Sequence, residues 1–106
     1  YKDDPFFIYL AYNAPYAPME ATDKYLDRFS GIESKRWRTY AAMVSAVDDG
    51  VGRILDQLEA LNLEENTLVA FLSDNGGPEH VNASENGSLR GKKGDLFEGG
   101  MRVPFQ

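Results

Sequence analysis

Residues 66–77 read NTLVAFLSDNGG, a short apolar run that ends abruptly in an acidic, glycine-containing turn. Leucine, valine and phenylalanine at successive positions are typical of a strand buried on both faces, as in a parallel sheet. A second run of this kind, residues 6–12, reads FFIYLAY and is followed by prolines at 15 and 18, which cannot continue a strand ladder. We therefore predict two buried strands, over 6–12 and 66–73.

A long amphipathic helix is predicted between these strands, from about Ser34 to Leu61. Ser34 is a suitable N-cap, and Asn62 suits the left-handed residue that ends a helix. A shorter helix is expected over residues 23–29, with Thr22 as its N-cap. The apolar positions of the long helix recur in steps of three and four and define one buried stripe, which comprises Trp37, Tyr40, Ala41, Val44, Val47, Val51, Ile54, Leu55, Leu58 and Leu61.

Two further expectations concern the long helix. Asp49 and Arg53 stand four residues apart and are predicted to form an ion pair on its solvent side. Gly50 and Gly52 are each unfavourable inside a helix by about 1 kcal/mol. We expect them to mark close packing of the helix against a strand.

A strand, a helix and a second strand in this order form a βαβ unit, which places the chain in the α/β class. The predicted architecture is part of a mostly parallel sheet flanked by helices. Both strands then end at the same edge of the sheet. The loops at 13–18 and from Asp74 onward should therefore face one crevice, where open α/β folds bind ligands.

Composition excludes several classes of function. The chain has 106 residues, a net charge of −6 and no cysteine. Nucleic-acid binding through a basic surface is not expected, and disulfides and thiolate metal sites are excluded. No apolar run approaches the roughly 18 residues that a membrane span needs. Both ends lie beside apolar segments, so we expect an internal slice of a larger enzyme, with a trimmed small domain as the alternative.

Hard oxygen donors follow the second predicted strand. Asp74 offers a carboxylate and Asn75 an amide oxygen, both suited to Ca²⁺ or Mg²⁺. Gly76 and Gly77 would let the backbone approach such an ion closely. An ordinary turn is the alternative interpretation of this stretch.

Cations follow in residues 89–94, which read LRGKKG and could hold an oxyanion. A solvated surface loop is the alternative. His80 is the single histidine and is a candidate acid–base group, although simple exposure is the plainer expectation. Asn82 and Asn86 each begin an Asn-Xaa-Ser glycosylation pattern, which also arises by chance.

Four stretches in this order resemble the sulfatase family. They are residues 5–15 (PFFIYLAYNAP), 40–52 (YAAMVSAVDDGVG), 66–77 (NTLVAFLSDNGG) and 89–104 (LRGKKGDLFEGGMRVP). The resemblance runs through nearly the whole chain and is to arylsulfatases, members of the alkaline phosphatase superfamily. It implies that residues 1–106 are the later part of the catalytic domain of a sulfuric ester hydrolase.

The resemblance also implies roles for individual residues. Asp74 and Asn75 match the pair that binds the active-site divalent ion, usually Ca²⁺, and Asp74 near the metal would help to accept a proton. Lys93 matches the lysine that contacts the substrate sulfate, in an aryl sulfate or a sulfated carbohydrate. The family nucleophile is a formylglycine, installed by a formylglycine-generating enzyme in a motif upstream of this chain. Family members are usually periplasmic, secreted or lysosomal.

One position departs from the family pattern. Most relatives have His after Asn-Ala-Pro, and that His contacts the sulfate or the leaving oxygen, whereas this chain has Tyr16. A phenol donates a hydrogen bond but does not act as an imidazolium near neutral pH. Three interpretations remain: Tyr16 is a neutral donor at the substrate, another residue takes over, or catalysis is weak.

Two other functions compete with sulfate ester hydrolysis. A relative in the same superfamily would hydrolyse phosphate or phosphonate monoesters. A non-catalytic homologue would keep the fold and bind a metal or a sulfated glycan. Because the nucleophile lies outside this chain, the piece by itself should be inactive.

Overall fold

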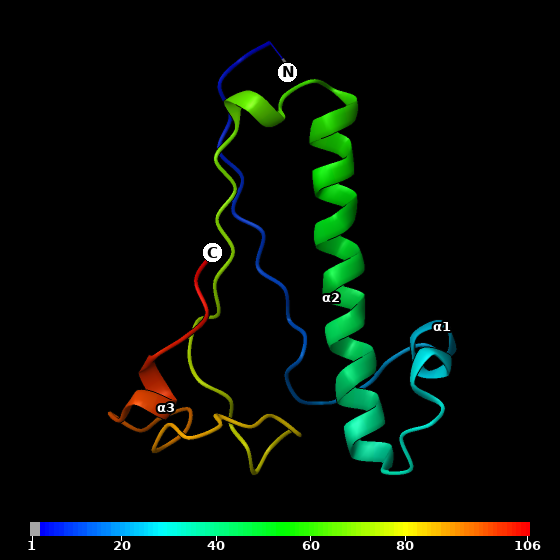
Figure 1. Cartoon of the computed structure of the whole chain (residues 1–106), viewed down its shortest axis with the longest axis vertical. Coiled ribbons are helices and arrows are strands. Elements are labelled where there is room, and N and C mark those ends of the chain that lie inside the picture. The colour runs from blue at the N-terminus through cyan, green and yellow to red at the C-terminus, as the bar shows by residue number, and fades with distance from the viewer. Residues whose placement is uncertain (1–2) are drawn as a thin grey trace.

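The computed structural model describes residues 3–106 (Figure 1). The elements are α1 (Asp23–Leu26), η1 (Asp27–Phe29), α2 (Lys35–Ala60), η2 (Glu64–Asn66) and α3 (Glu98–Met101). Helix α2 dominates the picture, with α1 on one side and two extended segments on the other. Among the described residues, no helix has both the length and the apolar character needed to cross a membrane.

The predicted long helix is confirmed almost to the residue. The hydroxyl of Ser34 accepts a hydrogen bond from the Trp37 backbone N at 3.4 Å, as an N-cap should. At the other end Asn62 has a φ of 55°. The Asn62 N–H donates to the carbonyl of Glu59 and the Leu63 N–H to that of Leu58, each at 2.9 Å, which is the Schellman pattern.

The short helix over 23–29 is also found, as α1 followed directly by η1. Thr22 occupies the N-cap position with extended backbone, but its side chain makes no capping hydrogen bond. The two short helices, α1 and η1, pack on α2. The chain then turns back to the start of α2.

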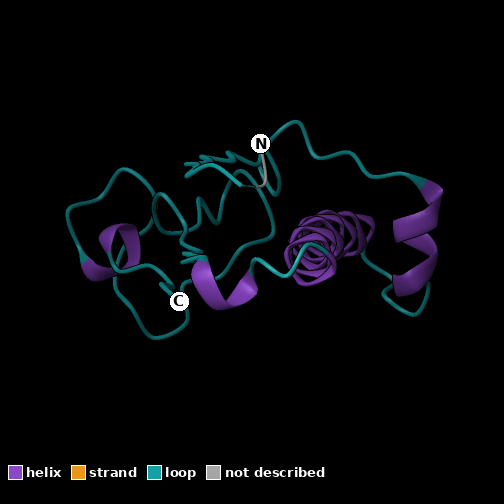
Figure 2. Ribbon diagram, turned by 90° about the horizontal axis from the view of Figure 1, so that it is seen from above, coloured by secondary structure: helices purple, strands orange, loops and turns teal. Residues whose placement is uncertain are grey.

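The predicted parallel sheet is absent from residues 3–106. Segments 6–12 and 67–73 run in the same direction beside α2 (Figure 1), but no strand ladder joins them, and Figure 2 draws both as loops. The described residues contain one isolated antiparallel bridge, between Leu72 and Phe105. There the N–H of Phe71 donates to Gln106 O at 2.8 Å, and the return bond is 2.9 Å. A strand exists only through its neighbours, and segment 6–12 has none here.

The prediction that both apolar runs are buried is likewise wrong for this chain by itself. The side chains of Phe7 and Leu68 are 91% and 95% exposed, and within residues 3–106 the buried apolar side chains are few and small: Ala42, Met43, Pro78 and Ala83. The radius of gyration is 16.3 Å, against about 13 Å for a compact domain of this size. An exposed apolar surface of this extent is normally buried against other protein segments. Residues 3–106 therefore supply one side of a core and not the whole of it.

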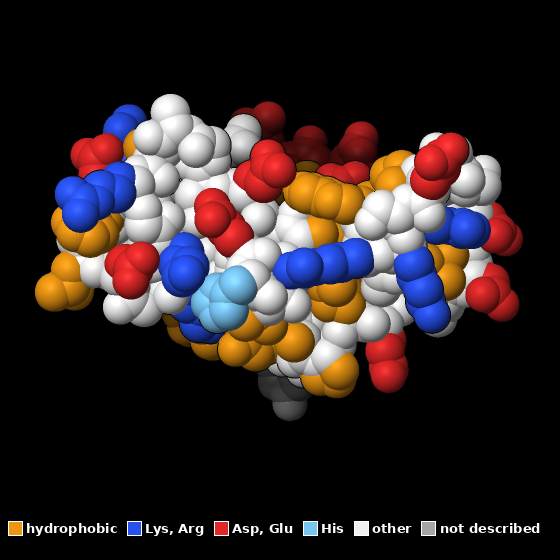
Figure 3. Space-filling model, turned by 90° about the horizontal axis from the view of Figure 1, so that it is seen from below, with side chains coloured by type: hydrophobic (Ala, Val, Ile, Leu, Met, Phe, Trp, Pro, Cys, Tyr) orange, Lys and Arg blue, Asp and Glu red, His pale blue; other side chains and the backbone are white. Residues whose placement is uncertain are grey.

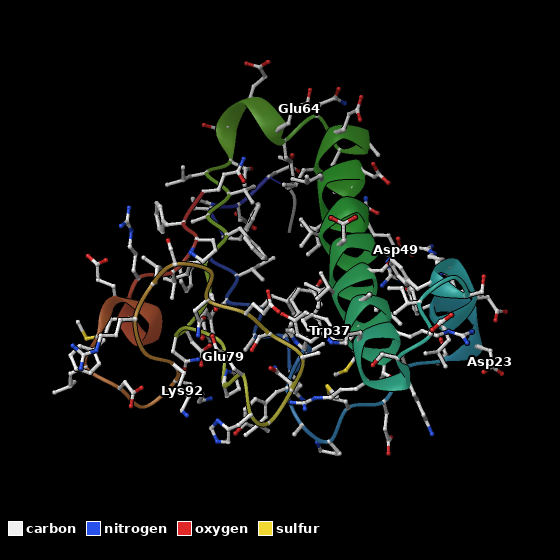
Figure 4. The ribbon with its side chains drawn as sticks, turned by 60° about the horizontal axis from the view of Figure 1, so that its bottom comes forward. Asp23, Trp37, Asp49, Glu64, Glu79 and Lys92 are labelled. Carbon is white, nitrogen blue, oxygen red and sulfur yellow. The ribbon has the colours of Figure 1, made fainter. Side chains whose placement is uncertain are left out.

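Asp49 makes a different ion pair from the predicted one. Its carboxylate accepts two 2.8 Å hydrogen bonds from the Arg28 guanidinium, and Lys24 lies 3.3 Å away, whereas Arg53 makes no such contact (Figure 4). The bidentate fork of Arg28 explains why a partner from another helix replaces the one four residues on. Hydrogen bonding to Arg28 holds the pKa of Asp49 well below its ordinary range. The pair fastens η1 to α2.

Gly50 confirms the expected close packing, and Gly52 does not. A methyl group built on Gly50 would lie 2.5 Å from the hydroxyl oxygen of Tyr12, so the end of segment 6–12 rests directly on α2. A methyl group on Gly52 would meet nothing within 4 Å. The contact between Gly50 and Tyr12 therefore fixes the position along α2 at which the first extended segment ends and the loop at 13–18 begins.

Candidate functional site

The two loops that follow the extended segments do converge, as the sequence predicts. The buried side chain of Asn82 donates from Nδ2 to the carbonyl oxygen of Pro15 at 2.9 Å, which joins the loop at 13–18 to the long loop after residue 73. Within the first loop, the N–H of Tyr16 donates to Asn13 O at 3.1 Å. The Nζ of Lys93 lies 4.4 Å from the centre of the Tyr16 ring. Tyr16 and Lys93, both expected at the sulfate, are therefore in direct contact across the two loops.

Asp74 and Asn75 form the second part of this region. The backbone carbonyl of Asn75 accepts from the Ser73 hydroxyl at 2.9 Å, and Asn75 Nδ2 donates to Gly76 O at 3.0 Å. The amide oxygen of Asn75 and the exposed carboxylate of Asp74 make no hydrogen bond within residues 3–106. Oxygen donors with this freedom fit a hard divalent cation.

The donor pair is only a fraction of a metal site. Residues 3–106 hold no group of three or more His, Cys, Asp or Glu side chains that could bind a metal. Ca²⁺ takes about six to eight oxygen ligands. Asp74 and Asn75 can therefore contribute to such a site but cannot complete it.

Glycines pack the two halves of the long loop against each other. The N–H of Gly76 donates to Gly100 O at 2.9 Å, and a Cβ on Gly76 would lie 1.7 Å from the carbonyl oxygen of Gly99. The space beside Gly76 is thus taken by the backbone of α3, which gives this glycine a packing role in holding the two halves of the loop together. Gly99 and Gly100 are buried and lie in the single turn of α3.

Of the three cations in residues 89–94, the structure turns only Lys93 toward Tyr16. The guanidinium of Arg90 lies 3.9 Å from the centre of the Phe97 ring and is engaged there. The N–H of Lys92 donates to the Asp95 carboxylate at 3.1 Å, which shapes the turn. The backbone N–H of Lys93 lies 3.4 Å from Gly77 O, so the lysine is tied to the stretch that carries Asp74 and Asn75.

Two asparagines shape the site and were not predicted to do so. Asn82 is 3% exposed, and its Oδ1 accepts from the Ser84 N–H at 2.9 Å. Asn86 accepts from the Gly77 N–H at 2.8 Å and donates to the carbonyls of Gly77 and Gly91. Both amides are occupied by backbone, which disfavours the glycosylation interpretation. The sequence did contain an indication of this role. Asn side chains in a polar, glycine-rich loop commonly form hydrogen bonds with nearby backbone groups.

His80 is exposed, and no hydrogen bond or ion pair joins it to Tyr16 or Lys93 within residues 3–106. Figure 3 shows the single histidine at the surface, and its ring makes no hydrogen bond with residues 3–106. A cavity of about 410 Å³ is lined by Arg36, Trp37 and the loop at 79–87 and not by Lys93 or Asp74. Figure 4 places Glu79 and Lys92 on the loop side of α2, opposite Asp23. The predicted site residues Tyr16, Lys93, Asp74 and Asn75 therefore do not line this cavity.

Comparison with known proteins identifies the family. The family model described as Sulfatase matches residues 1–105. The chain is 40% identical over 105 residues to "Uncharacterized sulfatase YdeN" of Escherichia coli (strain K12), with 97% of the chain and 19% of that protein covered. It is 40% identical over 107 residues to the Homo sapiens N-acetylgalactosamine-6-sulfatase, with the same coverage.

A solved structure agrees with these relatives. The crystal structure of Ps i-CgsB in complex with k-i-k-neocarrahexaose superposes with a TM-score of 0.90 at 48% identity. It covers 95% of this chain and 22% of that one. The chain thus spans about a fifth of the length of the proteins it matches. On these matches, the chain belongs to the sulfatase family.

Proposed function

We propose that the complete protein carrying this chain is a sulfuric ester hydrolase and that residues 1–106 form the later part of its catalytic domain. The observation that carries the proposal is the convergence of two loops that brings Lys93 to Tyr16 at 4.4 Å, with Asp74 and Asn75 tied to the same loop system. In the complete domain, segments 6–12 and 67–73 would gain neighbours and join a mostly parallel sheet.

Lys93 is the group that would bind the sulfate. A sulfate ester is an anion, and its cleavage places further negative charge on the leaving oxygen. A lysine ammonium offers three donors to such oxygens. A cation fixed in place before the reaction stabilises developing charge without reorganisation. The tie between Lys93 and Gly77, together with the ring of Tyr16, gives this lysine a defined position.

Asp74 and Asn75 would hold a divalent cation, with Ca²⁺ preferred and Mg²⁺ as the alternative. The remaining ligands would come from other parts of the protein. When bound, the ion supplies positive charge beside the sulfate. Asp74 would then stand near both the ion and the reacting centre, where its carboxylate can take up a proton.

The nucleophile and the cellular context are proposed from the family alone. A formylglycine, installed by a formylglycine-generating enzyme in a part of the protein outside this chain, would be hydrated, and a hydroxyl of the hydrate would attack the sulfur. A periplasmic, secreted or lysosomal location fits such an enzyme. The names of two relatives, an N-acetylgalactosamine-6-sulfatase and a protein bound to k-i-k-neocarrahexaose, favour a sulfated carbohydrate over a simple aryl sulfate as the natural substrate.

The ester type is tested with the complete protein, coexpressed with a formylglycine-generating enzyme and assayed on an aryl sulfate and an aryl phosphate in parallel. We expect turnover of the sulfate with Ca²⁺ and its loss in EDTA. Preferred phosphate turnover would establish the phosphomonoesterase alternative. Matured protein that turns over neither the esters nor sulfated oligosaccharides would establish a non-catalytic homologue.

Adjacent lysines provide a matched test of the binding group. Lys93→Ala should lower kcat/KM for the aryl sulfate by about 10²–10³, the loss expected from removing one preorganised donor to a developing oxyanion. Lys92→Ala removes the same charge one position away and should stay within about threefold of wild type. Equal losses in the two variants would contradict the assignment, because they would indicate a general effect of loop charge.

A further inference from the structure

Tyr16 presents the face of its ring to Lys93, and not only its hydroxyl group. The Nζ of Lys93 lies 4.4 Å from the ring centre, within the roughly 6 Å over which an aromatic quadrupole attracts a cation. The two residues come from loops far apart in the sequence. No hydrogen bond from the Tyr16 hydroxyl to another group occurs within residues 3–106.

The contact is held from both sides. On the Tyr16 side, the buried Asn82 fixes the carbonyl of the preceding Pro15, and the Tyr16 N–H closes a turn onto Asn13. On the Lys93 side, the backbone N–H of Lys93 faces Gly77 O. These hydrogen bonds hold the backbone of both loops, so the side chains of Tyr16 and Lys93 start from positions close to each other.

A lysine needs such support. Its four-carbon stem is flexible, and the loss of rotamer entropy opposes holding it in one place. An aromatic face restricts the ammonium on one side and accepts no hydrogen bond in the conventional sense. The N–H donors of Lys93 that point away from the ring therefore remain available to anion oxygens.

We propose that Tyr16 is a positioning residue that holds the Lys93 ammonium against its ring face for contact with the sulfate. The proposal rests on the proposed function, in which Lys93 binds the sulfate. It adds a fourth interpretation of the phenol at this position: the ring is the functional part, and the hydroxyl group is dispensable. Tyr16 transfers no proton and forms no bond to substrate in this role.

The decisive comparison separates ring from hydroxyl in the complete, matured protein. Tyr16→Phe keeps the ring face and should retain kcat/KM for an aryl sulfate within about twofold. Tyr16→Leu keeps an apolar side chain without the ring and should lose about 3- to 30-fold, the range that corresponds to a cation–π contact. If Tyr16→Phe falls as far as Tyr16→Leu, the hydroxyl is the functional group and the proposal is overturned.

A second readout does not use activity. Lysines are dimethylated with ¹³C-formaldehyde, and the Lys93 signal is assigned by its absence in Lys93→Arg. The proposal predicts an upfield ring-current shift of the Lys93 methyl signal in wild type and in Tyr16→Phe, and loss of that shift in Tyr16→Leu. Tyr16→Met replaces Tyr16→Leu if the leucine variant does not fold. A Lys93 signal that is the same in all variants overturns the proposal.

The two readouts also separate this inference from the proposed function. Matured wild type that shows the ring-current shift but turns over no sulfate ester would refute the proposed function. The contact between Tyr16 and Lys93 would then be real, but it would not position Lys93 for a sulfate. Sulfate turnover without the shift would leave the proposed function standing and overturn the role of Tyr16.

Discussion

Gly76→Ala is the substitution that most directly tests how the loops of the site are held. The ideal Cβ would lie 1.7 Å from the carbonyl oxygen of Gly99 and 2.7 Å from its carbonyl carbon. Both atoms belong to backbone, so no side chain can rotate away. Real Cβ atoms do not approach closer than 3.0 Å. The loop at 74–77 and the turn of α3 must therefore separate by more than about 1 Å in a packed protein.

This separation has two expected costs. Overpacking of well-packed sites costs about 1–3 kcal/mol of folding stability. Displacement of Asp74 and Asn75 relative to Lys93 should cost more in catalysis, because a 1 Å misplacement in an active site lowers rates by about 10²-fold. The hydrogen bond from Gly76 N to Gly100 O would lengthen as well.

The assay is kcat/KM for an aryl sulfate together with Tm, both on the complete protein. Gly52→Ala is the matched control, because its new methyl group meets nothing within 4 Å and it removes a glycine from a helix interior. That control should gain up to about 1 kcal/mol and keep its activity. Unchanged Tm and kcat/KM in Gly76→Ala would refute the idea that glycine contacts hold the two loops together.

Two further predictions concern stability. The folded-state pKa of Asp49 is depressed by Arg28, so its stabilising contribution is complete above the ordinary carboxyl pKa of about 3.9 and is lost as the pH falls below it. The Tm difference between wild type and Asp49→Asn in the complete protein should accordingly be constant from pH 8 to pH 5 and shrink below about pH 4. Asp48→Asn is the control. A Tm difference that grows in acid would contradict the stabilising ion pair between Asp49 and Arg28. Residues 1–106 expressed alone should bind a dye for exposed apolar surface and show no sharp thermal transition, because side chains such as Phe7 and Leu68 lack a cover; a cooperative melt without dye binding would contradict this.

Features governed by neighbours in the sequence were predictable. Ser34 and Asn62 bound α2 as the capping rules require, and Gly50 marks a close approach as expected. Asp49 shows where a local rule fails: the spacing favours Arg53, but the geometry of a bidentate contact favours Arg28 from another helix.

Features that depend on distant segments were not predictable in the same way. The strands over 6–12 and 66–73 were expected from composition, but a ladder needs neighbours that residues 3–106 do not supply. Residue chemistry singled out Asp74 and Asn75 as cation ligands, and family resemblance singled out Lys93 for sulfate. The predicted topology brought the two loops to one crevice, but it did not indicate that the Lys93 ammonium lies over the Tyr16 ring, because that contact depends on side-chain conformations.

The central claim is that Lys93, Tyr16, Asp74 and Asn75 belong to one site for a metal ion and a sulfate group. A crystal structure of the complete, matured protein with Ca²⁺ and inorganic sulfate tests it most directly. We predict a sulfate oxygen within hydrogen-bonding distance of Lys93 Nζ, the ammonium still against the Tyr16 ring, and Ca²⁺ bound by Asp74 and Asn75. Sulfate bound elsewhere with Lys93 turned into solvent, or Ca²⁺ held without Asp74 and Asn75, would contradict the account.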